Sequence, residues 1–200
     1  IAQIKSINNC IDLPLMSVYL DAGVVPFAER EEKRTNATSK DLTNYRRVAP
    51  GDFVLNNQQA WRGSVGVSFH SGIVSPAYIV LSLNNTLDSQ YANYLFRSRC
   101  MVDQYLLISR GVGSIQRNLY WSALKRVVVP IPSKEEQMEI VEYLDNINNK
   151  FDVTIKKLTE EVAVLEEYKN KIIADTVTGK IDVRGIEIPE YEFVDEDNDN

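Results

Sequence analysis

The sequence predicts a mixed α/β (α+β) domain followed by one long coiled-coil helix, and three observations support this fold class. The composition, with 44% hydrophobic and 25% charged residues in a chain of 200, is typical of a globular protein. Residues 1–132 contain short apolar runs between turn residues, as strands do. Residues 134–174 contain neither Gly nor Pro, and their apolar residues recur at steps of seven, as in a coiled coil.

The first part of the chain, residues 1–132, is expected to form the α/β domain. Its apolar runs predict strands at 53–55, 65–69, 77–81 and 127–129. Residues 88–109 carry apolar side chains at helical spacing and end before Gly111, which predicts one helix packed on the sheet. Residues 33–44 are polar and lack periodicity, so we expect an exposed loop there.

The long helix is expected to cover residues 133–178, before a tail at 179–200. Two prolines end an extended stretch, Ser133 can then cap the helix, and Glu136 completes a capping box. The apolar seam of this helix consists of Leu144, Ile147, Phe151, Ile155, Leu158, Val162, Leu165, Tyr168 and Ile172. About 41 helical residues at about 1.5 Å each form a rod of roughly 60 Å. Such a seam needs a partner, and we expect a second copy of the chain in a homodimer; the alternative is that the seam packs back onto the domain.

Charge is divided unevenly along the chain. Residues 1–133 hold 14 Lys and Arg against 9 Asp and Glu, a net charge of +5, whereas residues 134–200 hold 8 against 19, a net charge of -11. A basic first part suits contact with phosphates. Acidic residues that only solvate a helix and a tail explain the second part equally well, so charge by itself leaves the partner open.

Several classes of protein are disfavoured by what the sequence lacks. No stretch approaches the about 18 apolar residues of a membrane span, and residues 1–9 do not resemble a signal peptide, so we expect a cytoplasmic protein. Cys10, Cys100 and His70 are too far apart to form a local metal or redox motif, and both thiols are expected to be buried. The sequence contains no recognisable catalytic motif, which predicts a protein that is not an enzyme.

Three stretches of the first part carry a family resemblance. They are 48–56 (VAPGDFVLN), 60–68 (AWRGSVGVS) and 72–78 (GIVSPAY). Four further stretches match the same family: 13–19 and 23–26 upstream, 129–140 at the start of the helix, and 174–184 at its end. In order and spacing they resemble the target-recognition domain and spacer helix of type I restriction-modification specificity (S) subunits. Full-length subunits of that family carry two recognition domains and two helices. This chain has one of each, as expected for a half-subunit, a truncated gene product or an expressed fragment.

The resemblance implies a domain that reads one half of a bipartite target in double-stranded DNA, and a helix that pairs antiparallel with a second helix. It also implies that the S-adenosylmethionine-dependent adenine methyltransferase (M) and the nuclease (R) are separate subunits, so that this chain binds no cofactor of its own. Two identical chains would present identical readers to a split palindrome. Three other interpretations stay open: an enzyme with a fused specificity role, a coiled-coil protein-interaction module, and a stand-alone DNA-binding regulator.

DNA bases are read by Arg, Lys, Asn and Gln side chains on loops or helix ends. The candidates form three groups: Lys33, Arg34 and Asn36; Gln58 and Arg62; and Arg110, Ser114, Gln116, Arg117 and Asn118. The last group is favoured because Gly111 and Gly113 let the backbone of this loop approach a phosphate between two arginines. A solvated surface charge is the competing explanation for each arginine. Trp61, Tyr120 and Trp121 could stack on an extruded base, although core packing is favoured.

Overall fold

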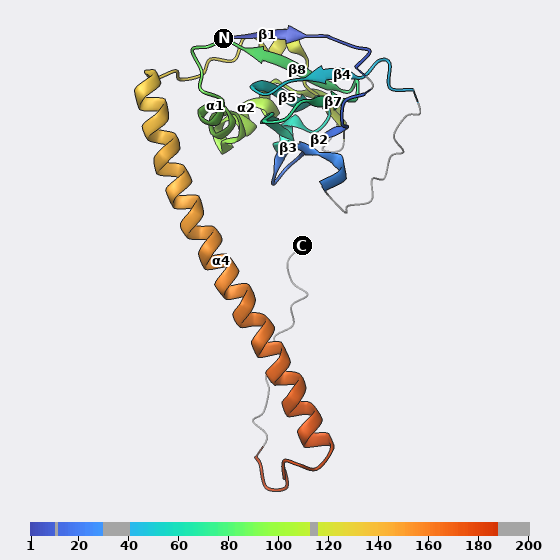
Figure 1. Ribbon diagram of the computed structural model, residues 1–200, viewed down its shortest axis with the longest axis vertical. Helices are drawn as coiled ribbons and strands as arrows, with labels where there is room; N and C mark the ends of the chain where they lie inside the picture. Colours follow the sequence, from blue (N-terminus) through green and yellow to red (C-terminus); the bar gives the residue numbers. More distant parts are fainter. Residues whose placement is uncertain (11, 30–40, 113–115, 188–200) are drawn as a thin grey trace. The chain divides into compact units, whose positions relative to one another are not determined.

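The computed structural model in Figure 1 describes residues 1–10, 12–29, 41–112 and 116–187. It divides into two compact units, Ile1–Asp145 and Asn146–Asn200. The predicted fold class, a mixed α/β domain with a long helix after it, is confirmed. None of the described helices is both long enough and apolar enough to cross a membrane.

The first unit is built on a four-stranded antiparallel sheet. Its order is β1 (Ala2–Lys5), β8 (Tyr78–Leu83), β5 (Asp52–Asn56) and β6 (Val65–Val67). Alternate residues of the two central strands enter two different apolar clusters, because successive side chains of a strand point to opposite faces. Phe53 and Leu81 pair across the sheet in the first cluster, and their neighbours Val54 and Val80 pair in the second. The sheet is therefore covered on both faces.

Two short strand pairs build the second cluster. They are β2 (Met16–Tyr19) with β3 (Gly23–Pro26), and β4 (Arg46–Val48) with β7 (Gly72–Val74). Their apolar side chains, such as the fully buried Met16 and Val48, pack on the Val54 face of the sheet. Gly72 is required at this contact, because a Cβ there would lie 2.2 Å from Cγ of Met16 and 2.7 Å from the Pro14 carbonyl oxygen.

Three helices contribute to the first cluster. These are α1 (Ser89–Arg97), α2 (Arg99–Ile108) and α3 (Trp121–Leu124). The unit also contains two short 3-10 helices, η1 (Phe27–Glu29) and η2 (Ala60–Arg62). The single helix predicted at 88–109 is therefore two helices. Ser98 separates them because its backbone is extended, with φ -61° and ψ 150°, and its hydroxyl donates to the Leu95 carbonyl at 2.6 Å.

Two further predictions for the first unit are wrong. No strand forms at 127–129; Val127 and Val129 pack against the first cluster, whereas Val128 is 92% exposed. The thiol predictions also fail, because Cys10 is half-buried and Cys100 is exposed. Most of the loop predicted at 33–44 lies outside the described residues.

The long helix α4 (Lys134–Val177) begins where the capping motif predicts. The Ser133 hydroxyl accepts a hydrogen bond from the backbone N–H of Glu136 at 3.2 Å. Gly179 follows its end with a φ of 74°, a left-handed conformation that suits a glycine after a helix. The first compact unit extends to Asp145, beyond the domain end expected at residue 132, because the first turns of α4 pack on the domain.

The N-cap of α1 can be tested by substitution of Asp88. Oδ1 of Asp88 accepts from the backbone N–H groups of Gln90, at 2.8 Å, and Tyr91, at 3.0 Å. Asp88→Ala leaves both donors unsatisfied and is expected to lower the free energy of unfolding by about 1 kcal/mol in urea titrations. Asp103→Ala is the control, since it removes only an exposed i,i+4 ion pair with Arg99 and should cost less than about 0.5 kcal/mol. Equal losses for the two variants would contradict the capping role.

Candidate nucleic-acid interface

The segment after β5 presents an exposed arginine in a fixed setting. The backbone N–H of Gln58 donates to Oδ1 of Asn56 at 3.0 Å, and the Trp61 indole N–H donates to the Gln58 carbonyl at 3.0 Å. The Arg62 guanidinium lies 4.6 Å from the centre of the Trp61 ring. Gln58 and Arg62 are both exposed, while Trp61 is half-buried. The face of the Trp61 indole thus supports the Arg62 guanidinium, while its N–H donates to the Gln58 carbonyl within the same turn.

In the favoured group, the described residues 110–112 and 116–118 form a strand pair where the sequence predicted a loop. β9 (Arg110–Val112) runs antiparallel to β10 (Gln116–Asn118), with Arg110 opposite Asn118 and Gly111 opposite Arg117. Arg110 is exposed, whereas Asn118 and Arg117 are half-buried. The Arg117 guanidinium donates to the Leu106 carbonyl at 3.4 Å, so it is partly engaged by the end of α2.

These two groups lie next to each other in the fold. The backbone N–H of Leu119, directly after β10, donates to the Asn57 carbonyl at 2.8 Å, and the Leu119 side chain is buried. This hydrogen bond joins segments that are about 60 positions apart in the sequence. The remaining candidates Lys33, Arg34, Asn36 and Ser114 lie outside the described residues, and for Gln116 only the backbone, in β10, is described.

An unsatisfied acceptor lies at the same junction. Oδ1 of Asn57 is buried and has no hydrogen-bond partner, alone among the buried side-chain nitrogen and oxygen atoms of the described residues. Buried polar atoms in folded proteins are nearly always paired with protein or water. Because this atom is buried, it is an unsatisfied acceptor of the interior and is not part of the exposed surface.

A polar groove of about 370 Å³ adds a second arginine that the sequence did not single out. Arg62 and Arg97 both line it, together with Asn93 and Val102. The Arg97 guanidinium donates to the carbonyls of Leu20, at 3.1 Å, and Asp21. Burial lowers the pKa of Arg97, and the nearby Asp21 charge opposes that shift. The structure places Arg97 in the last turn of α1, where a basic side chain complements the helix C-terminus. The sequence predicts a single helix over 88–109, with Arg97 in its middle, and so gives no sign of its place beside Arg62.

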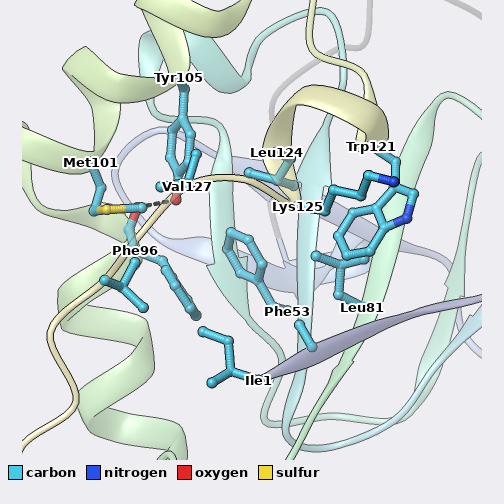
Figure 2. A pocket seen from close by; sticks show the side chains of 12 residues that line it. Ile1, Phe53, Leu81, Phe96, Met101, Tyr105, Trp121, Leu124, Lys125 and Val127 are labelled. Carbon is cyan, nitrogen blue, oxygen red and sulfur yellow. Dashed lines mark hydrogen bonds between the residues drawn. The ribbon is translucent and has the colours of Figure 1, made fainter.

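The apolar pocket in Figure 2 has a different character. Phe53, Phe96 and Trp121 turn toward the same space, and the two phenylalanine rings have centroids 4.3 Å apart. The Tyr105 hydroxyl donates to the Phe96 carbonyl at 3.1 Å, and burial raises its pKa, which keeps the phenol neutral. Trp121 is half-buried and Tyr120 is 51% exposed, so neither is a fully buried core residue. This lining is suited to packing, with no acid–base pair directed into the space.

Metal-ion chemistry has no support in the described part of the chain, where no three His, Cys, Asp or Glu residues lie close enough to hold a metal ion. His70 is exposed and its backbone is held by Ser68, whose hydroxyl donates to the His70 carbonyl at 2.8 Å.

The predicted seam of α4 is almost entirely uncovered. Leu144 and Ile147 are half-buried. The remaining seam side chains are 40 to 61% exposed: Phe151, Ile155, Leu158, Val162, Leu165, Tyr168 and Ile172. They follow the spacing that brings residues to one side of a helix. The second unit thus presents an apolar stripe to solvent.

Comparisons with known proteins converge on one family. The model of the type I restriction modification DNA specificity domain matches residues 2–163. The type I restriction enzyme MjaIX specificity subunit of Methanocaldococcus jannaschii is 32% identical over 133 residues, covering 64% of this chain and 29% of that subunit.

A solved structure concerned with complex assembly and conformational transition of the type I R-M system contains a chain of similar fold. The two chains share 17% identity with a TM-score of 0.57, over 87% of this chain and 42% of the other. The present chain thus spans less than half the length of each of these two proteins.

Substitution of Arg110 tests whether the candidate interface binds DNA phosphates. Arg110→Ala removes an exposed charge and is expected to weaken binding to duplex DNA at low salt, and to reduce the slope of log affinity against log salt by about one. Titrations by fluorescence anisotropy at several salt concentrations measure both quantities. Arg99→Ala, which removes an exposed arginine at the start of α2, is the matched control. An unchanged slope for Arg110→Ala would exclude a phosphate contact at this residue.

Proposed function

The chain belongs to the family of type I restriction modification DNA specificity domains, and on this premise we propose that it reads one half of a bipartite DNA target for a restriction-modification complex. The observation that carries the proposal is the match to the family model over residues 2–163, which covers the α/β unit and about two thirds of the spacer helix together. Within that match, the two groups of polar candidates at 57–62 and 110–118 meet at the Asn57–Leu119 hydrogen bond.

The proposed role is recognition without catalysis. Specificity subunits of this family are non-catalytic, and the relative from Methanocaldococcus jannaschii is named as such a subunit. Methyl transfer, with S-adenosylmethionine, would belong to a partner methyltransferase subunit, and cleavage to a partner nuclease subunit. The chain would supply these partners with a fixed position on DNA. Exposed donors such as Arg62, Arg110 and Gln58 would contact phosphates and base edges.

The seam of α4 supports a homodimer. A stripe of seven apolar side chains at coiled-coil spacing, each 40 to 61% exposed, is costly in water and is covered well by a matching stripe. Antiparallel pairing of two copies would place identical recognition units at opposite ends of a two-helix rod. Two-fold symmetry then requires the target to be a split palindrome, with a spacing that depends on the length of the rod.

Substitution at the middle of the seam tests the homodimer. Leu158→Glu introduces a charge into the proposed apolar contact and is expected to convert a dimer into a monomer at tens of micromolar in sedimentation equilibrium. Lys156→Glu is the control, because residue 156 lies about 200° around the helix from residue 158 at about 100° per residue, on the opposite face. Sedimentation of the wild-type chain as a monomer at that concentration would exclude the homodimer.

Genome-wide methylation mapping tests the recognition role. The chain is expressed with a methyltransferase subunit of its own restriction-modification system in a host without adenine methylation. We expect methylated adenines in a single two-part motif whose halves are inverted copies. If methylation appears without such a motif, or does not depend on this chain, the chain is an interaction module and not a DNA reader.

A further inference from the structure

One glutamine of the spacer helix has an environment unlike that of every other residue in that helix. The structure describes all of α4, and Gln137 is its one buried residue, with a side chain that is 0% exposed. A polar side chain is buried at a cost unless its hydrogen-bonding groups find partners. The surroundings of Gln137 show what those partners are.

The Gln137 amide joins three backbone segments. Its Nε2 donates to the carbonyl of Thr86 and to that of Pro132, both at 2.9 Å. Its Oε1 accepts from the backbone N–H of Asp88 at 2.7 Å. Thr86 follows β8, Asp88 caps α1, and Pro132 directly precedes the helix. The side chain thus ties the first turn of α4 to the sheet and to α1.

Only an amide of this length satisfies all three partners. Two carbonyls require a donor and one N–H requires an acceptor, and glutamine offers both. A glutamate would place an oxygen against carbonyl oxygens, and a methionine of similar size would leave all three backbone groups without a partner. The requirement at position 137 is therefore chemical as well as steric.

Helix α1 makes two more contacts within the first compact unit, one to the segment just before α4 and one to α4 itself. The Tyr91 hydroxyl donates to the Pro130 carbonyl at 3.3 Å, just before α4 begins. The Tyr94 hydroxyl donates to Oδ1 of Asp145, two turns beyond Gln137. Between these points, Ile140 and Val141 pack against the first core cluster. The first three turns of α4 are thus fixed to the domain, and Gln137 is the buried centre of that attachment.

We propose, on the basis of the function proposed above, that Gln137 is a positioning residue that fixes the direction in which α4 leaves the recognition domain and thereby sets the spacing of the two DNA half-sites. The reason is that a small change of angle at the attachment produces a large displacement at the far end of a long helix. The 32 helical residues after Asp145 span about 48 Å, so a change of about 5° at the attachment displaces the far end by about 4 Å. That exceeds the rise of about 3.4 Å per base pair. A small loosening of the attachment would therefore admit a neighbouring spacing.

Methylation of DNA targets with varied spacing tests the proposal. The complete complex of this chain with its methyltransferase is given targets in which the half-sites are fixed and their separation varies by one or two base pairs in either direction. We expect the wild-type chain to prefer one spacing at least about tenfold over its neighbours. Gln137→Met is expected to reduce that preference to about threefold or less, with unchanged preference for the half-site bases. Gln90→Met, an exposed glutamine on α1, is the control.

The pattern of activity separates positioning from simple loss of stability, since an unstable variant loses activity at every spacing alike. A wild-type complex that methylates no two-part target overturns the proposed function itself. A wild-type complex that selects one spacing, with Gln137→Met selecting it equally well, overturns the role of Gln137 and leaves the proposed function standing.

Hydrogen exchange in the free full-length chain tests the attachment without DNA. The backbone amides of 138–145 are expected to exchange at least about tenfold faster in Gln137→Met than in the wild type, and at wild-type rates in Gln90→Met. Unchanged exchange overturns the inference. If Gln137→Met does not fold, Gln137→Asn serves in both experiments, because it keeps an amide but shortens its reach to the three backbone partners; wild-type selectivity and exchange in that variant also overturn the inference.

Discussion

A helix with a continuous apolar stripe is stable in water only when something covers the stripe, and the second unit of this chain depends on that constraint. Every residue from 148 to 174 is exposed, including the seam side chains from Phe151 to Ile172. Most helical stability in proteins comes from packing of an amphipathic face, and little comes from helix propensity alone. The α/β unit, in contrast, has two apolar clusters of its own. The α/β unit thus covers its own apolar residues, whereas the stripe of α4 would be covered by the pairing proposed above.

The two halves also respond oppositely to ions. Contacts between arginines such as Arg62 or Arg110 and phosphates weaken as salt rises, because bound counterions are released on binding. Residues 134–177, which form α4, hold 6 Lys against 11 Asp and Glu, a net charge of -5, so two helices paired as proposed would repel each other and salt would screen that repulsion. Under the proposed function, moderate ionic strength would weaken DNA binding and strengthen association of the helices. The acidic second part is also a poor surface for DNA, which confines the proposed contacts to the α/β unit.

Sequence reasoning succeeded where the deciding interactions are local. The start of α4 follows from Ser133 and Glu136, three positions apart, and the seam follows from a seven-residue repeat. It failed where a distant partner decides. Residues 127–129 have strand composition but no pairing strand, and 110–118 resemble a loop until Arg110 meets Asn118 across the pair. The junction of Asn57 with Leu119, and the burial of Gln137 by segments about 50 positions away, leave no trace in local spacing.

The junction at Asn57 and Leu119 has an evolutionary consequence. The hydrogen bond that joins the two segments uses backbone atoms, and the anchoring Leu119 is buried, while Gln58, Arg62 and Arg110 face solvent. Replacement of an exposed side chain usually changes folding stability by less than about 0.5 kcal/mol. New binding preferences can thus arise by successive point substitutions on an unchanged scaffold. Substitutions at the exposed positions would leave intact the frame that orients them.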